Sequence, residues 1–109
     1  MVDMKLWIDD VRPAPEGYVW IRSVNKAHEF IEIYENIYRR EQGPFMKIVL
    51  IDIDHDAGDY AEYGGDYIKL LDWLEETGRN YPIRIHSMNP VGVENMRRII
   101  QKNGWTEVR

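Results

Sequence analysis

The residues of this chain that could carry chemistry gather where apolar, strand-like runs end. Asp9 and Asp10 follow the first such run, Leu6-Trp7-Ile8. A denser polar group, Asp52, Asp54, His55 and Asp56, comes at the end of the run that begins at Ile48. In a parallel sheet covered by helices, the carboxyl ends of the strands face the crevice where ligands bind. Carboxylates that meet there suit a divalent cation and a phosphate.

Composition narrows the function classes. The chain has 109 residues, enough for one domain with a sizeable core, and we expect a single domain over residues 1–109. Its 14 basic and 19 acidic residues give a net charge of −5, without a long basic run. Binding of extended duplex nucleic acid is therefore disfavoured, whereas one phosphate or one strand end held through a metal is allowed.

Residue types that are missing also exclude functions. Without cysteine there is no disulfide, no thiolate zinc site and no cysteine nucleophile. The N-terminus does not resemble a signal peptide, and no apolar run reaches the roughly 18 residues that a membrane helix needs. We expect a soluble, cytoplasmic protein that does not bind membranes.

Apolar patterns of strand and helix type alternate along the chain. The strand patterns cover residues 4–8, 18–21, 47–53, 82–86 and 105–108, and the third should be central because it is apolar almost throughout. Helical spacing covers residues 24–39, 66–77 and 90–103, with Asn89 suited to cap the last helix. This order predicts a small open α/β sheet, mainly parallel, with about five strands and three helices.

The first connection is unusual. Residues 12–17 contain two prolines and a glycine, which oppose helix formation. The segment is also too short for an ordinary crossover helix. Either the first helix of a doubly wound fold is missing, or the first two strands pair in another way.

The acidic groups and Ser87 together resemble the phosphorylation site of a response-regulator receiver domain. In that family, carboxylates from the first and third strands hold Mg²⁺, a hydroxyl residue after the fourth strand contacts the phosphoryl group, and a lysine on the fifth neutralises charge. Residues 105–109 contain no lysine, so this resemblance is incomplete.

A closer resemblance covers nearly the whole chain. The segments that carry it are KLWIDDVRPAP from Lys5, Asp54-His55-Asp56, Gly65-Asp66-Tyr67 and HSMNPVG from His86. They are similar to the cyclic-phosphate-processing receiver domain family, a receiver derivative that lacks the first helix. The resemblance implies a receiver-like (flavodoxin-like) fold and the processing of cyclic phosphate ends in RNA repair. The chain departs from the family pattern at Asp52, where a small polar residue is expected, and at Ala57, where leucine is expected.

Opening a 2′,3′-cyclic phosphodiester requires one group to take a proton and another to give one. Histidine does both near neutral pH, so we predict His55 and His86 as the acid/base pair. Asp9, Asp10 and Asp54 would hold Mg²⁺ or Mn²⁺. The phosphate would contact the Ser87 hydroxyl and backbone amides at the start of the last helix.

The phosphate contacts are therefore assigned to Ser87, Asn89 and Gly92. Three further residues lie close enough in sequence to contribute, namely Asp56, Asp52 and Arg12. The expected ligand is a nucleotide or RNA end that carries a cyclic phosphate, and Tyr60 and Tyr63 could stack on its base.

Less specific interpretations remain open at this point. Asp9 and Asp10 would also suit a turn, and Asn89-Pro90 is explained by capping alone. Neighbouring strand residues point to opposite faces, so His86 would pack under a helix if Ser87 faces the site. Besides a hydrolase, the sequence allows a phosphoacceptor signalling module or a noncatalytic binding domain. It leaves the oligomeric state undetermined.

Overall fold

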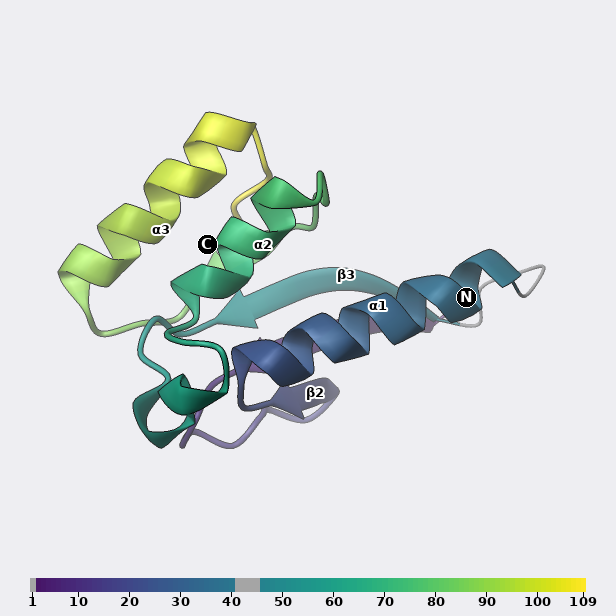
Figure 1. The fold of residues 1–109 in the computed structure, drawn as a ribbon, viewed down its shortest axis with the longest axis horizontal. Coiled ribbons are helices and arrows are strands. Elements are labelled where there is room, and N and C mark those ends of the chain that lie inside the picture. Colours follow the sequence, from purple (N-terminus) through teal and green to yellow (C-terminus); the bar gives the residue numbers. More distant parts are fainter. Residues whose placement is uncertain (1, 41–45) are drawn as a thin grey trace.

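The computed structural model describes residues 2–40 and 46–109, which form one parallel sheet of four strands (Figure 1). The strands are β1 (Val2–Ile8), β2 (Tyr18–Ile21), β3 (Met46–Ile53) and β4 (Ile83–Ile85), in the spatial order β2-β1-β3-β4. All neighbouring strands run parallel. The predicted parallel α/β fold, with the third strand in the interior of the sheet, is confirmed.

Three helices form a single layer against this sheet. They are α1 (Val24–Arg40), α2 (Ile68–Glu76) and α3 (Pro90–Asn103), and a short 3₁₀ helix, η1 (Gly58–Tyr63), precedes α2. Helix α2 contacts both α1 and α3, and Figure 1 shows it between the other two helices. Within the described residues no helix covers the opposite face of the sheet, which we call the open face. Among these residues no helix is both long and apolar enough to cross a membrane.

The strand sequences explain which face is buried. Ile8, Ile53 and Ile85 are register partners across β1, β3 and β4, and Ile8 and Ile53 are fully buried in the core beneath the helices. Because side chains alternate along a strand, the residue before each of these isoleucines faces the open side. There Trp7, Asp52 and Arg84 stand in a second row of register partners.

The connection between β1 and β2 contains no helix. The two strands pair directly and in parallel, which decides between the two arrangements that the sequence left open. Indole groups fasten this connection: Trp7 Nε1 donates to the Arg12 carbonyl at 2.9 Å, and Trp20 Nε1 donates to the Asp9 carbonyl at 2.8 Å. The first crossover helix is therefore missing, as the family resemblance implies.

The prediction of a fifth strand at 105–108 is wrong in extent. Only an isolated parallel bridge joins Ile83 to Glu107. Two backbone hydrogen bonds accompany it, from Ile83 to Thr106 at 3.0 Å and from Val108 to Ile83 at 2.7 Å. Because β4 has just three residues, it offers the returning chain too short an edge for a regular strand.

We predict that Ser23→Ala lowers the free energy of unfolding by about 1 kcal/mol, because Ser23 Oγ accepts the backbone N–H of Lys26 at 3.1 Å and caps the first turn of α1. Urea denaturation would measure the change. Ser23→Gly is the control, since glycine at a cap costs only a few tenths of a kcal/mol. Equal losses for the two variants would contradict the capping role.

Candidate functional site

The sheet register brings three polar side chains together. Asp9, Asp54 and His86 each come directly after one of the register partners Ile8, Ile53 and Ile85, on three adjacent strands. Backbone hydrogen bonds extend the ladder to them, because Asp54 N donates to the Ile8 carbonyl and His86 N to the Ile53 carbonyl, both at 2.9 Å. The three residues therefore lie in one row at the carboxyl ends of the strands.

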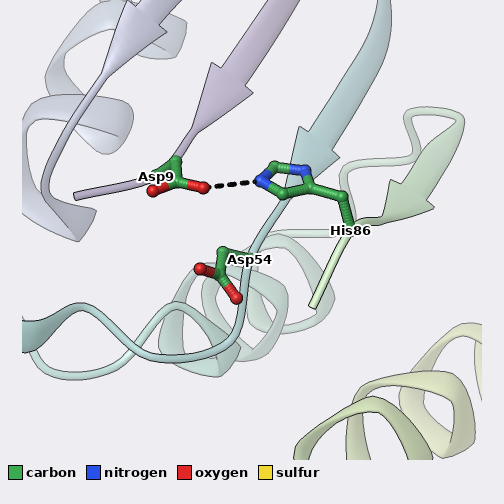
Figure 2. Close-up of side chains that lie close together, drawn as sticks. All are labelled: Asp9, Asp54 and His86. Carbon is green, nitrogen blue, oxygen red and sulfur yellow. Dashed lines mark hydrogen bonds and ion pairs between the residues drawn. The ribbon is translucent and has the colours of Figure 1, made fainter. Parts of the chain in front are cut away.

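One ligand atom from each of these residues lies within 4.8 Å of the others (Figure 2). The closest contact joins His86 Nε2 and Asp9 Oδ2 at 3.0 Å. Asp54 uses Oδ1 to accept the backbone N–H of His55 at 2.7 Å. We call Asp9, Asp54 and His86 the triad.

Asp9 is fully buried and is held by its own loop. Its Oδ1 accepts the backbone N–H groups of Val11 at 3.0 Å and Arg12 at 2.9 Å. Burial by itself would raise the pKa of Asp9, but these two amides and His86 together bring that pKa below its ordinary value. Arg12, predicted as an additional site residue, contributes its backbone amide to this arrangement.

Asp10 lies beside the triad. A Cβ added at Gly58, whose φ is +53°, would sit 2.3 Å from Asp10 Oδ2, so the glycine makes room for this carboxylate. Burial raises the pKa of Asp10, and the negative charges of Asp9 and Asp54 raise it further. Asp9 and Asp10 thus differ in surroundings: hydrogen bonds stabilise the charge of Asp9, whereas burial and the neighbouring charges oppose that of Asp10.

His86 faces the open side of the sheet. The ring stacks on Trp7 with centroids 3.8 Å apart and planes 5° from parallel. Its Nδ1 is 2.7 Å from Oδ1 of Asp52, a fully buried carboxylate that also contacts Arg84 Nη1 at 3.3 Å. His86 does not pack under a helix, which was the alternative that the sequence left open, because residues 84 and 86 share the face opposite the helices.

His55 lies apart from these contacts, on the loop after β3, and packs against the start of α3. Its Nδ1 is 2.9 Å from Asp56 Oδ1, and 15% of the His55 side chain is exposed. A Cβ at Gly92 would approach the His55 ring to 2.4 Å, so the absence of a side chain at residue 92 lets the imidazole pack on the helix. Asn89 Nδ2 reaches Asp56 Oδ2 at 3.4 Å from the other side.

The predicted phosphate ligands at the start of α3 are engaged with one another. Asn89 caps the helix as expected, since its Oδ1 accepts the N–H of Gly92 at 3.0 Å. The Asn89 N–H donates to Ser87 Oγ at 3.1 Å. The two amides therefore already have acceptors, whereas the Ser87 hydroxyl keeps its proton to donate, because its oxygen acts here as an acceptor.

The chemistry of the triad fits a metal ion. Two carboxylates and an imidazole are common ligands of divalent cations, and a spacing within 4.8 Å allows small side-chain rotations to bring all three onto one ion. Burial and the charges of Asp9 and Asp54 raise the pKa of Asp10, and a cation bound beside these carboxylates would favour its ionised form.

Two contributors to the site were not predicted from the sequence. Trp7 supports His86, although its position two residues before Asp9 already signalled a shared face. Tyr67 is fully buried beneath the site and donates its hydroxyl proton to the Arg22 carbonyl at 2.7 Å. Burial raises the pKa of Tyr67, and the charges of the neighbouring aspartates raise it further.

The parallel sheet with acidic residues after β1 and β3 defines a receiver-like α/β domain. The family model described as the cyclic-phosphate processing receiver domain matches residues 4–102. The chain therefore belongs to the cyclic-phosphate processing receiver domain family. Searches of curated proteins and of solved structures gave no significant match.

We predict that Asp10→Asn stabilises the metal-free protein at pH 7. The pKa of Asp10 is raised in the fold, so the folded state binds its proton more tightly than the unfolded state, and ionised Asp10 costs stability above that pKa. The gain should disappear below pH 3.8, the ordinary pKa, where the carboxyl is protonated in both states. Thermal unfolding across this pH range measures it.

Asp59→Asn is the control for this experiment, because it removes the same charge from an exposed position on η1. A stability gain of equal size in both variants would assign the effect to net charge and contradict a local effect of burial and neighbouring charges at Asp10.

Proposed function

We propose that this protein hydrolyses 2′,3′-cyclic phosphates at nucleotide or RNA ends, with a divalent cation such as Mn²⁺ or Mg²⁺ held by the triad. The observation that carries the proposal is the convergence of Asp9, Asp54 and His86 at the strand ends, with His55 on the following loop. Membership of a family described by cyclic-phosphate processing supports it. RNA repair is the setting in which such ends would need processing.

His55 is the proton-transfer group in this proposal. A proton on Nδ1 donates to Asp56 at 2.9 Å, which leaves the lone pair on Nε2 to accept a proton from water. As the water oxygen bonds to phosphorus, the bond from phosphorus to one ribose oxygen breaks; that oxygen takes up a proton from solvent water, and His55 returns its own proton to the solvent. One water is consumed, and the product is a 2′ or 3′ phosphomonoester.

His86 has a different environment. Asp52 and Asp9 lie at hydrogen-bonding distance from its two ring nitrogens. Since neither nitrogen is free to face water, we assign proton transfer to His55 and group His86 with the metal ligands. Of the two histidines predicted as the acid/base pair, His55 keeps that role in this proposal, and His86 is given the role of a metal ligand instead.

The remaining groups would bind the phosphate. Ser87 would donate its hydroxyl proton to a nonbridging oxygen. A bound cation would neutralise those oxygens and orient the phosphorus for attack. The bound cation would also stabilise the ionised form of Asp10, whose pKa is raised by burial and by the charges of Asp9 and Asp54.

A groove of about 450 Å³ near the site suits the nucleoside part of such a ligand. Trp20, Arg22 and Tyr60 are among its lining residues. The Arg22 guanidinium carbon lies 4.7 Å from the ring centroids of both Trp20 and Tyr60, and Arg22 Nη2 donates to the Asp10 carbonyl at 2.7 Å. Aromatic rings and guanidinium groups are surfaces on which nucleobases stack.

The first test of this function is hydrolysis of nucleoside 2′,3′-cyclic phosphates with Mn²⁺ or Mg²⁺, followed by ³¹P NMR. We expect His55→Asn to lower kcat by about 100-fold or more, because general acid–base catalysis contributes rate factors of about 10²–10⁴. His28→Asn is the matched control: His28 stacks on Trp73 in the helix layer, outside the site.

Unchanged hydrolysis by His55→Asn would remove this residue from the mechanism. A wild-type protein that hydrolyses none of these substrates with either metal would contradict the proposed function. Covalent labelling of Asp54 by acetyl phosphate, without turnover, would favour a phosphoacceptor module instead.

A second prediction concerns the groove. Tyr60→Ala should raise KM for nucleoside cyclic phosphates by roughly tenfold with little change in kcat, because base–aromatic stacking contributes about 1–3 kcal/mol. Tyr60→Phe should behave as wild type. A cyclic phosphate without a base serves as the control substrate, and an equal KM increase for it would contradict base stacking at Tyr60.

A further inference from the structure

The His86 ring is held in one orientation from three sides. Asp52 contacts Nδ1 at 2.7 Å, Asp9 contacts Nε2 at 3.0 Å, and Trp7 stacks on the ring with a centroid distance of 3.8 Å. Only 10% of the His86 side chain is exposed. The direction in which Nε2 points is therefore set by the fold before any ligand binds.

Asp52 is the unusual member of this arrangement. It lies on β3, two residues before Asp54, and both Asp52 and Asp9 are fully buried. A buried carboxylate is costly unless it receives hydrogen bonds, and Asp52 receives them from His86 Nδ1 and from Arg84 Nη1 at 3.3 Å. Asp52 thereby holds a proton on Nδ1, so Nε2 is the nitrogen that would give up its hydrogen bond to Asp9 and offer a lone pair to a bound cation.

We propose that His86 Nε2 is a metal ligand together with Asp9 and Asp54, and that Asp52 is the positioning residue that presents it. The site then prefers a first-row transition-metal ion such as Mn²⁺ over Mg²⁺. This inference rests on the proposed function for the presence of a cation at the triad, and it adds the class of cation.

The donor atoms carry the choice of metal. Mg²⁺ binds through oxygen and keeps several water ligands, so an imidazole nitrogen contributes little to its affinity. Imidazole suits first-row transition metals such as Fe²⁺, Ni²⁺, Cu²⁺ and Zn²⁺, and Mn²⁺ stands at the weak end of this series. A carboxylate on the remote ring nitrogen raises the basicity of the nitrogen that binds the metal. The Asp52–His86 contact has this arrangement, because Asp52 takes Nδ1 and Nε2 faces the carboxylates of the triad.

A purely structural interpretation predicts something different. A doubly protonated His86 ring would donate to Asp52 and Asp9 at once and would link two buried carboxylates without any metal. In that case Nε2 keeps its proton when a cation is present, and the cation binds through oxygen alone. The nature of the atoms around the bound metal separates the two interpretations.

Pulsed EPR of the Mn²⁺-loaded full chain, labelled with ¹⁵N-histidine, provides the direct test. We expect a ¹⁵N coupling from one coordinated imidazole in the wild type. His55→Asn is the matched histidine control and should keep the coupling, whereas His86→Gln should lose it. Wild-type protein that binds Mn²⁺ without any ¹⁵N coupling would overturn the proposal, and this result needs no variant to fold.

The role of Asp52 is tested by metal titration. Asp52→Asn should weaken Mn²⁺ binding about 10–100-fold, as loss of an outer-sphere partner typically does, and should change Mg²⁺ binding much less. Equal losses for both metals, or wild-type binding of Mg²⁺ as tight as that of Mn²⁺, would overturn the preference. Because these measurements do not involve turnover, they stay distinct from a failure of the proposed hydrolysis.

Discussion

The parallel register of β1, β3 and β4 is the constraint on which the rest of this molecule depends. It aligns Ile8, Ile53 and Ile85 in one row, so the next residue of each strand, Asp9, Asp54 or His86, falls in the next row. A slip of one residue would exchange the two faces of a strand and turn its isoleucines toward the open side. Core burial therefore secures the same register that assembles the triad.

The site also concentrates charge that the fold must stabilise. Asp9 and Asp52 are fully buried, and the hydrogen bonds to each include one at a nitrogen of the His86 ring. Backbone amides of the β1–β2 loop supply further donors to Asp9. Asp10 has the least support, and burial together with the charges of Asp9 and Asp54 raises its pKa. A site in which the charge of Asp10 lacks such support is well suited to a ligand that brings positive charge.

The helix that is missing after β1 gives the site its surroundings. A short loop held by two indole N–H groups replaces it, and the open face keeps the Trp7–His86 stack and the buried Asp52 without a covering helix in the described part of the chain. Arg22 links the loop to the groove beside it through the Asp10 carbonyl. The same local change thus supports both the histidine and the surface where a nucleoside would bind.

The sequence by itself determined the four strands, the Asn89 cap and the position of polar residues after the strands, because these follow from local periodicity and from the geometry of parallel strand ends. It overestimated the fifth strand, since pairing there depends on the length of its neighbour. Only the tertiary structure decided that Asp9 contacts His86 while Asp10 lies against Gly58, and that Asp52 holds the ring. Those contacts depend on strand order and side-chain rotation between residues far apart in the chain, which no local pattern encodes.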